Sequence, residues 1–411
     1  MAGSSVPVVL DPFGRDLYGE AARLRSLGPV VRVVLPGGVG AWSVNRYDLI
    51  RRVLADERVS KDAYRHWPAW ISGEVDQSWP LAMWVSVRSM LTAHGGEHTR
   101  LRRLVAGVFT ARRVAGLVPR VGEITGELLD RLEGVPAGGV VDVRRAFAFE
   151  LPIRVIAQLL GLEGGEGEAF HRVVEGLFTT SADADTARRH QVELYGLLDA
   201  LVARKRARPA ADLTSALIAM RDEEGRGLTE KELVDTLHLI LGAGHETTVN
   251  LLDHALCALL THPDQRRLLE SGAVPWEAAV DETLRLRAPV ATILLRFAVR
   301  DIELEGTVIA AGEPIVLSLV AAGGDRDTHG ADADTFDVTR ATRRDHLAFG
   351  HGVHHCVGRP LAMCEALTAL PAFFTRFPRA RLAVDPGELQ PLESFISSGH
   401  TALPVLLTPA S

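Results

Sequence analysis

The chain has 411 residues, a formal charge of −7 and 47% apolar residues, which is typical of a folded protein and argues against one that coats nucleic acid. Its three cysteines are too few for a disulfide scaffold. The start lacks the features of a signal peptide and no apolar run reaches about 20 residues, so we expect a cytoplasmic protein without a membrane segment.

The first elements are predicted from short patterns. Residues 1–8 show no periodicity and are expected to be flexible. Short β-branched runs between Pro29 and Val44 lie on either side of Pro36-Gly37-Gly38 and predict a hairpin. Asn45 is expected to cap a short helix that ends near Asp56.

Residues 57–96 show no sustained period and hold four of the six tryptophans, Trp67, Trp70, Trp79 and Trp84. Long irregular stretches inside a compact protein are usually functional loops. Tryptophans also act as apolar anchors that fix an irregular segment in place. Substrate contact and simple packing are therefore both open for this segment.

Helical spacing of apolar residues dominates from about Glu97 to Arg285. The segments with this spacing are 97–111, 113–133, 150–161, 165–180, 184–207 and 212–223. Thr229 and Glu232 match a capping box, and the helix that they open is predicted to run unbroken to Thr261. At about 1.5 Å per residue this helix would be about 45–50 Å long, enough to cross a domain, and its apolar middle predicts burial.

Short strand patterns return from Asp301 to Val320 and again from Glu388 to Pro409. No break along the chain is long or polar enough to be an interdomain linker. The sequence therefore predicts one large domain over residues 1–411, mainly α-helical with small β-sheets.

The segment 349–358, Phe-Gly-His-Gly-Val-His-His-Cys-Val-Gly, is the most informative stretch. Its first two glycines allow tight turns and the close approach of a flat group. Cys356 directly precedes a helical pattern that opens at Arg359-Pro360, where backbone N–H groups and the helix dipole are expected to lower its pKa and favour a metal-binding thiolate. Zinc is an alternative because histidines lie nearby, but tetrahedral zinc sites usually draw ligand pairs from two segments, and the chain has no Cys-x-x-Cys pair.

The same segment resembles the heme-binding signature of the cytochrome P-450 superfamily, Phe-Gly-x-Gly-x-His-x-Cys-x-Gly, at every specified position. The resemblance implies a mainly α-helical fold with a long central helix over heme b. It implies that the Cys356 thiolate is the axial ligand of the heme iron; Cys364 is a second thiol outside the glycine frame. The cofactor-binding positions that it implies in this segment are Phe349, Gly350, His354, Cys356 and Gly358.

Three basic residues elsewhere resemble the propionate-binding residues of that family. His98 and Arg102 lie four apart on one predicted helical face, where a solvated charge would be the ordinary interpretation. The resemblance implies that they neutralise heme propionates, and that Arg296 does so as well.

Glu282 and Arg285 resemble the structural Glu-x-x-Arg pair of the family, and their spacing allows an ion pair on one helical face. Arg340 would complete this network. The resemblance implies that the three residues hold the cysteine segment in place and take no part in chemistry.

The stretch from Ala243 to Thr248 places a carboxylate and two hydroxyls in the middle of the predicted buried helix. Such groups need water, a ligand or a helix distortion to offset the cost of burial. The stretch resembles the oxygen-binding motif of the family, in which an acid–alcohol pair widens the helix locally and relays protons. Glu246 would be the relay acid and Thr247 the hydroxyl that holds dioxygen, while His245 receives no role.

Candidate substrate contacts come from four segments, although each of them is equally well explained as core. They are Trp84, Val85, Met90, Leu239, Ala243, Val290, Ala291, Thr292, Phe395 and Ile396. Their apolar character predicts a bulky, weakly polar substrate. The chain resembles the soluble actinobacterial branch of the family, which acts on steroids, macrolactones and cyclic peptides.

The leading hypothesis is therefore a monomeric heme-thiolate monooxygenase of secondary metabolism that uses O2 to hydroxylate or otherwise oxidise such a molecule. The chain has no flavin or iron–sulfur segment and no nicotinamide fingerprint, so the resemblance implies ferredoxin and ferredoxin reductase as electron donors. One alternative is an enzyme that couples aromatic groups on the same heme. Another is a non-catalytic heme sensor or carrier, which the acid–alcohol pair disfavours.

Overall fold

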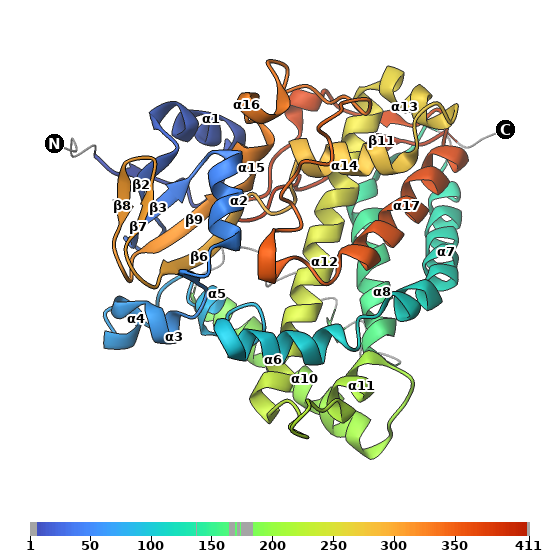
Figure 1. Ribbon diagram of the computed structural model, residues 1–411. Coiled ribbons are helices and arrows are strands. Elements are labelled where there is room, and N and C mark those ends of the chain that lie inside the picture. Colours follow the sequence, from blue (N-terminus) through green and yellow to red (C-terminus); the bar gives the residue numbers. More distant parts are fainter. Residues whose placement is uncertain (1–5, 137, 164–168, 171–172, 174–183, 409–411) are drawn as a thin grey trace.

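The structure, a computed structural model, describes residues 6–408 except 137, 164–168, 171–172 and 174–183. The long helix α12 (Glu230–Thr261) passes through the middle, with the main β-sheet on one side and α7 (Ala111–Glu133), α8 (Glu150–Leu160) and α17 (Arg359–Arg376) on the other (Figure 1). No described helix combines the length and the apolar character needed to span a bilayer. The mainly α-helical architecture with small sheets that the sequence predicted is confirmed.

The described helices differ greatly in length. In the first half of the chain they are α1 (Leu17–Leu27), α2 (Tyr47–Ala55), α3 (Ala63–His66), α4 (Pro68–Ser72), α5 (Met83–Ser86), α6 (Gly95–Ala106), α7 (Ala111–Glu133), the π-helical η1 (Arg144–Phe149) and α8 (Glu150–Leu160). After them come α10 (Ala184–Ala207), α11 (Leu213–Ala219), α12, α13 (Pro263–Glu270), α14 (Trp276–Leu286), α15 (Leu319–Gly323), α16 (Arg326–His329), α17 (Arg359–Arg376) and the 3-10 turns η2 (Gly352–His354) and η3 (Pro386–Glu388).

The described strands form three sheets. The largest has the order β1-β2-β3-β9-β6-β4, and the others have the orders β10-β11-β5 and β7-β8. The strands are β1 (Val8–Val9), β2 (Val30–Val34), β3 (Gly40–Val44), β4 (Val59–Ser60), β5 (Val140–Asp142), β6 (Thr292–Ala298), β7 (Ile302–Leu304), β8 (Thr307–Ile309), β9 (Pro314–Ser318), β10 (Arg381–Leu382) and β11 (Pro404–Leu406).

Most predicted helices are present, and the long helix matches closely. Thr229 and Glu232 form the reciprocal capping box, in which Glu232 N donates to Thr229 Oγ1 at 3.3 Å and Thr229 N donates to Glu232 Oε2 at 2.8 Å. The helix runs to Thr261 as predicted. The helix expected at 165–180 lies outside the described residues except for 169, 170 and 173.

Two local predictions need correction. The predicted hairpin is present as β2 and β3, but the flexible start ends earlier than expected, because Val8 pairs with Val33 in the main sheet; residues 1–5 lie outside the described part. Asn45 does not cap α2: it is buried and accepts a hydrogen bond from Ser43 Oγ at 2.7 Å. The N-terminal amide of α2 at Tyr47 instead donates to Asp325 Oδ2 at 2.8 Å, so a distant carboxylate caps this helix.

Strand β6 was not predicted from the sequence. It lies between β9 and β4, and nearly every residue from Thr292 to Ala298 is buried. A strand buried on both faces shows no alternation of polar and apolar residues, which is the pattern that identifies a strand in sequence.

The hydrophobic core has one part around α12 and one part on each face of the main sheet. Trp67, Trp70 and Trp79 are buried on one face of the sheet, where the Trp67 ring stacks on Phe297 with centroids 5.2 Å apart. Packing thus explains three of the four tryptophans in the irregular segment, while Trp84 stays half-buried.

Candidate functional site

The cysteine segment forms a tight loop that packs against α2 and leads into α17. Gly350 and Gly352 both have φ of 71°, a conformation that favours glycine. A side chain at Gly352 would lie 2.7 Å from the Leu54 carbonyl oxygen, so this glycine also permits close packing. Cys356 N donates to Phe349 O at 2.9 Å and closes the loop.

The Cys356 side chain reaches open space on one side, while protein encloses it on the others. This enclosure raises the pKa of the thiol, whereas backbone N–H groups of Gly358 and Arg359 oppose the rise. The expectation of a lowered pKa was therefore wrong for the chain alone, because desolvation outweighs the helix N-terminus. A bound metal ion would reverse this balance, since it stabilises the thiolate directly.

Two histidines from distant parts of the chain meet beside the cysteine loop. The rings of His98 in α6 and His354 in η2 have centroids 4.2 Å apart. Burial, with Arg102 nearby, lowers the pKa of His98 to about 4, and burial together with surrounding cations lowers the pKa of His354 further. Arg102 Nη2 donates to His355 O at 2.7 Å, which ties α6 to the loop.

A buried lysine outside the predicted site residues extends this basic group. Lys61 follows β4, and its Nζ donates to Leu294 O at 2.9 Å. Burial and the neighbouring Arg296 lower the pKa of Lys61 well below its usual range. Arg296 in β6 is itself buried, which lowers its pKa to about 10. A single lysine in an irregular segment matches no sequence pattern that would predict a binding role. Lys61 lies beside Arg296 only because β4 pairs with β6.

We call His98, Arg102, Arg296, His354 and Lys61 the basic cluster. Within the described residues, His98 Nε2 and Arg296 Nε are buried without a hydrogen-bond partner. Among the described residues, only basic groups act on His354 and Lys61, and none is a compensating carboxylate. Such a cluster requires an anionic partner. Two carboxylates on a flat group bound at Cys356 fit these donors, and heme b carries two propionates.

The middle of α12 has one face that is open and one that is buried. Leu239, Ala243 and Thr247, each four residues apart, are partly or fully exposed although the helix crosses the molecule. Thr247 Oγ1 donates to Ala243 O at 2.6 Å. The backbone stays α-helical here, so the locally widened turn that the resemblance implied is not present.

The acid of the acid–alcohol pair lies on the buried side of α12. Glu246 Oε1 accepts a hydrogen bond from Asn250 Nδ2 at 3.0 Å and lies 3.7 Å from Arg144 Nη2. Burial raises the pKa of Glu246, which favours the protonated, proton-donating form. His245 is fully buried, and its Nε2 lies 3.3 Å from Phe149 O, away from the open face.

The predicted structural trio forms a buried ion-pair network. Arg285 Nη2 and Nε each donate to a Glu282 oxygen at 2.7 Å, and Arg340 Nε donates to Glu282 Oε1 at 3.3 Å. Arg285 Nη1 also donates to the carbonyl oxygens of Gly323 and Ala333, at 2.6 and 2.7 Å. The network thus joins α14 to the chain segment that precedes the cysteine loop.

The candidate substrate residues divide by burial. Val85, Ala291, Phe395 and Ile396 are buried in the core beneath the main sheet, and Thr292 is buried in β6. Trp84, Met90, Val290 and Leu239 are half-buried, and Ala243 is exposed on the open face of α12. The second set can border a ligand without unfolding of the core.

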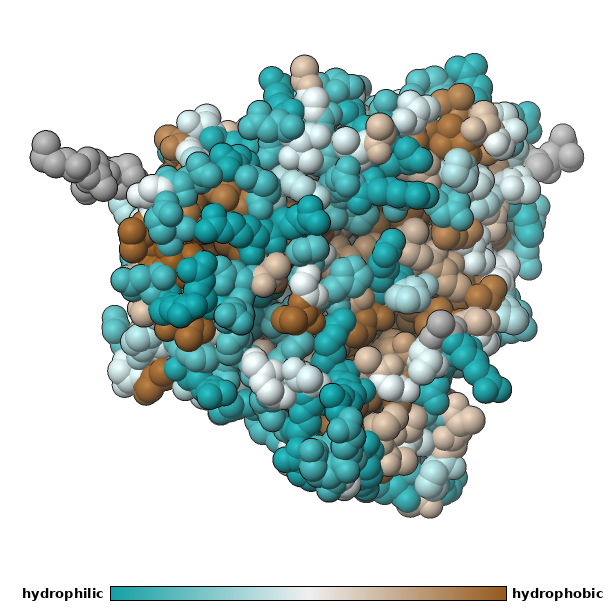
Figure 2. All heavy atoms as spheres, viewed as in Figure 1, coloured by the Kyte–Doolittle hydropathy of each residue, from teal (hydrophilic) through white to brown (hydrophobic). Residues whose placement is uncertain are grey.

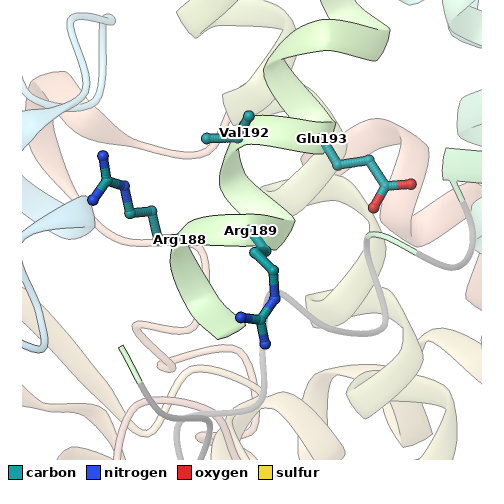
Figure 3. Close-up of a pocket in the computed structure, with 4 residues that line it drawn as sticks. All are labelled: Arg188, Arg189, Val192 and Glu193. Atoms are coloured by element: carbon teal, nitrogen blue, oxygen red, sulfur yellow. The ribbon is translucent and has the colours of Figure 1, made fainter. Parts of the chain in front are cut away.

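Apolar side chains show between hydrophilic ones in the middle of the face drawn in Figure 2, over α12 and α17. A separate cavity of about 370 Å³ lies at the start of α10, lined by Arg188, Arg189, Val192 and Glu193 (Figure 3). None of the predicted site residues lines this cavity, so we assign the candidate site to the cysteine loop and the open face of α12.

Comparison with known proteins identifies the family. The cytochrome P450 family profile matches residues 178–270 and 276–394. The 2-hydroxy-5-methyl-1-naphthoate 7-hydroxylase of Streptomyces carzinostaticus is 42% identical over 98% of this chain and 97% of its own length.

Solved structures agree with this match. CYP154A1 from Streptomyces coelicolor A3(2) has a TM-score of 0.92 and 49% identity, covering 98% of this chain and 100% of its own. Testosterone-bound CYP154C4 from Streptomyces sp. ATCC 11861 has a TM-score of 0.94 and 42% identity, covering 98% and 99%. The chain therefore belongs to the cytochrome P450 family and is a P450 monooxygenase.

Proposed function

We propose that the protein binds heme b through Cys356 and hydroxylates a bulky, weakly polar small molecule. The observation that carries the proposal is the basic cluster beside the cysteine loop, with its buried, unpartnered donor atoms. His98, Arg102, Arg296, His354 and Lys61 would hold the two propionates. Phe349, Gly350 and Gly358 would shape the loop that presents the thiolate.

Heme with a thiolate ligand supplies the activation of dioxygen for attack on a C–H bond. The chain itself has to orient the substrate and deliver protons. Thr247 lies on the open face of α12, where its hydroxyl can hold dioxygen and an ordered water. Glu246, one residue earlier and buried, would hold the proton that this hydroxyl passes on.

The Glu282 network would fix the position of the cysteine loop. Arg340 Nη1 donates to His329 O at 2.7 Å, while Arg285 holds the carbonyls of Gly323 and Ala333. These bonds anchor the segment between β9 and the loop at several points. Because the ion pairs are fully buried, removal of one partner would leave an uncompensated charge and loosen the segment.

The proposed substrate is a steroid, a macrolactone, a cyclic peptide or a molecule of similar bulk. The open face of α12, with Leu239 and Ala243, and the half-buried Trp84 offer apolar contacts and no fixed charge. One relative supports this class, because its solved structure is testosterone-bound. We also propose ferredoxin and ferredoxin reductase as the electron donors.

The axial ligand is tested by two matched cysteine substitutions. Cys356→Ser should abolish the reduced carbon-monoxide difference spectrum that thiolate ligation produces, together with oxidative activity. Cys364→Ser changes the second thiol, which lies further along the chain in α17, and should retain both. A normal spectrum in Cys356→Ser, or its loss in Cys364→Ser alone, would show that the ligand is assigned wrongly.

The reaction is tested by a panel of steroids, macrolactones and cyclic dipeptides. Substrate binding should shift the heme spectrum, and turnover should add the mass of one oxygen atom to the product. A product that instead loses two hydrogens would identify the enzyme as an oxidative coupling catalyst. Binding of small charged molecules alone would contradict the proposed substrate class.

A further inference from the structure

A row of buried polar side chains connects Glu246 with the C-terminal part of the chain. Arg144 Nη2 lies 3.7 Å from Glu246 Oε1, and Arg144 Nη1 lies 3.5 Å from Asp253 Oδ2. Asp253 Oδ2 accepts hydrogen bonds from the backbone N and from Nδ1 of His400, both at 2.9 Å. The Asp253 side chain is 0% exposed, whereas that of His400 is 18% exposed. The row therefore begins at solvent and ends at the proposed relay acid.

Three separate segments of the chain build this row. Glu246, Asn250 and Asp253 lie at positions i, i+4 and i+7, which share one face of α12. Arg144 opens η1, the π-helical segment that packs against α12, and such segments are frequent at functional sites. His400 lies in the C-terminal part of the chain, where a short bridge joins it to Pro391. No local sequence pattern links these positions.

The row contains buried polar atoms that lack a protein partner. Among the described residues, Arg144 Nη1, Asn250 Oδ1 and Asp253 Oδ1 are buried and make no hydrogen bond. Buried polar atoms in this situation are normally satisfied by internal water. The separations of 3.5 and 3.7 Å on either side of Arg144 are also too long for strong direct hydrogen bonds, and water can bridge them.

Two other roles are less consistent with this geometry. Asp253, His254 and His400 offer three ligand atoms within 4.8 Å of one another, as a metal site would. The Arg144 guanidinium beside Asp253 opposes a second cation, and His254 Nε2 is engaged with Ser398 Oγ at 3.0 Å. A purely structural ion pair would be expected to satisfy its polar atoms within the protein, which this row does not do.

We propose that His400, Asp253 and Arg144 supply protons from solvent to Glu246 through internal water. The inference rests on the proposed relay role of Glu246. For each proton that Glu246 gives to the Thr247 hydroxyl, His400 takes one proton from solvent and releases its Nδ1 proton to Asp253. Asp253 passes a proton through the internal water to Glu246, so every group returns to its starting charge. Arg144 stays charged throughout and orients the water, which makes it a positioning residue.

The test compares His400→Gln and Asp253→Asn with Glu246→Gln as the reference. The matched control is Tyr18→Phe, because the Tyr18 hydroxyl bonds Ser398 Oγ at 2.9 Å in the neighbouring hydrogen-bond chain and lies off the proposed route. NADPH-driven dioxygen consumption, with surrogate ferredoxin and reductase, is measured in H2O and in D2O. The carbon-monoxide difference spectrum verifies heme and thiolate in each variant.

We expect Glu246→Gln to slow dioxygen consumption and to raise the solvent isotope effect. His400→Gln should also raise the solvent isotope effect and should slow dioxygen consumption by about tenfold. This loss is at or below the lower end of the usual effect of a general acid–base group, because water partly replaces the imidazole ring. Adding His400→Gln to Glu246→Gln should cause no further loss, since both act on one proton path. Asp253→Asn should match His400→Gln, and Tyr18→Phe should match the unchanged protein.

The outcomes separate this inference from the proposed function. If Glu246→Gln slows turnover but His400→Gln and Asp253→Asn behave like Tyr18→Phe, protons enter elsewhere and the route is wrong. If Glu246→Gln has no effect, both the relay role and the route are wrong, while heme ligation by Cys356 stands. The His400 side chain is partly exposed, so we expect His400→Gln to fold without disrupting the buried core.

Discussion

Neighbouring residues on α12 differ in role because the helix turns by about 100° at each position. Thr247 and Thr248 make the same local bond, from their hydroxyls to the carbonyls of Ala243 at 2.6 Å and Gly244 at 3.1 Å. Thr247 lies on the open face, whereas Thr248 is buried. The two side chains have the same chemistry but different surroundings. Substituting each of them in turn therefore separates effects on turnover from effects on the stability of the fold.

Thr247→Ala should lower the yield of product per electron pair by about tenfold or more, because the hydroxyl that orders dioxygen and water is lost. Its free energy of unfolding should change by less than about 1 kcal/mol. Thr248→Ala should instead cost about 1–2 kcal/mol and leave the yield intact. Product and NADPH assays with urea unfolding measure both, and equal effects on yield would contradict the assignment.

A single buried histidine also gives the stability a defined dependence on pH. Burial lowers the pKa of His254 from 6.5 to about 3. The unfolded chain binds this proton near pH 6.5 and the folded chain only near pH 3, so between these values the unfolded state holds more protons. The contribution to stability is therefore full above pH 6.5 and is lost as the pH falls towards 3.

His254→Asn should accordingly flatten the fall of the unfolding free energy between pH 6.5 and the acid limit of folding. Urea unfolding at a series of pH values measures the slope. His262→Asn is the control, because this half-buried histidine lies at the N-terminal end of α13 and outside both the cysteine loop and the core of α12. A slope that His254→Asn leaves unchanged would show that this group titrates normally.

At the scale of elements, two helical glycines differ in whether packing requires them. Gly323 ends α15, and a side chain there would lie 1.9 Å from the Arg285 carbonyl oxygen at the end of α14. This contact explains the glycine at 323, whose own carbonyl receives a bond from the buried ion-pair network. Gly116 lies in α7, where a Cβ atom would have no neighbour within 4 Å beyond the helix's own backbone, so nothing in the packing requires glycine.

Gly323→Ala should lower the free energy of unfolding by about 1–3 kcal/mol, because the backbone of α14 has to move. Gly116→Ala should raise it by about 0.5–1 kcal/mol, since alanine restricts the unfolded chain and favours the helix. Thermal and urea unfolding measure both changes. The same sign for the two substitutions would contradict the packing of α15 against α14.

At the scale of the whole molecule, the cofactor and the chain are expected to stabilise each other. The basic cluster brings basic side chains from α6, from the segment after β4, from β6 and from η2 into one buried place. Without an anion these groups repel and remain desolvated, so we expect bound propionates to stabilise the fold around them.

Lys61→Met should therefore have opposite effects in the two states of the protein. The heme-free chain should gain about 1 kcal/mol or more, because a buried amine is replaced by an apolar side chain of similar length. The heme-bound protein should lose stability and release heme faster, because a propionate partner is missing. Urea midpoints with and without heme measure this, and a loss in both states would place Lys61 outside the propionate site.

Local sequence patterns determined the features that depend on neighbouring residues. The capping box at Thr229 and the glycine frame around Cys356 could be read from the chain because each is a short-range geometric requirement. Tertiary structure alone decided the others. Lys61 joins the basic cluster through strand pairing, and Arg144 and His400 both contact Asp253 of α12, while the pKa of Cys356 follows from enclosure by distant segments. Burial and charge pairing act between residues that are close in space, and a linear pattern records only closeness along the chain.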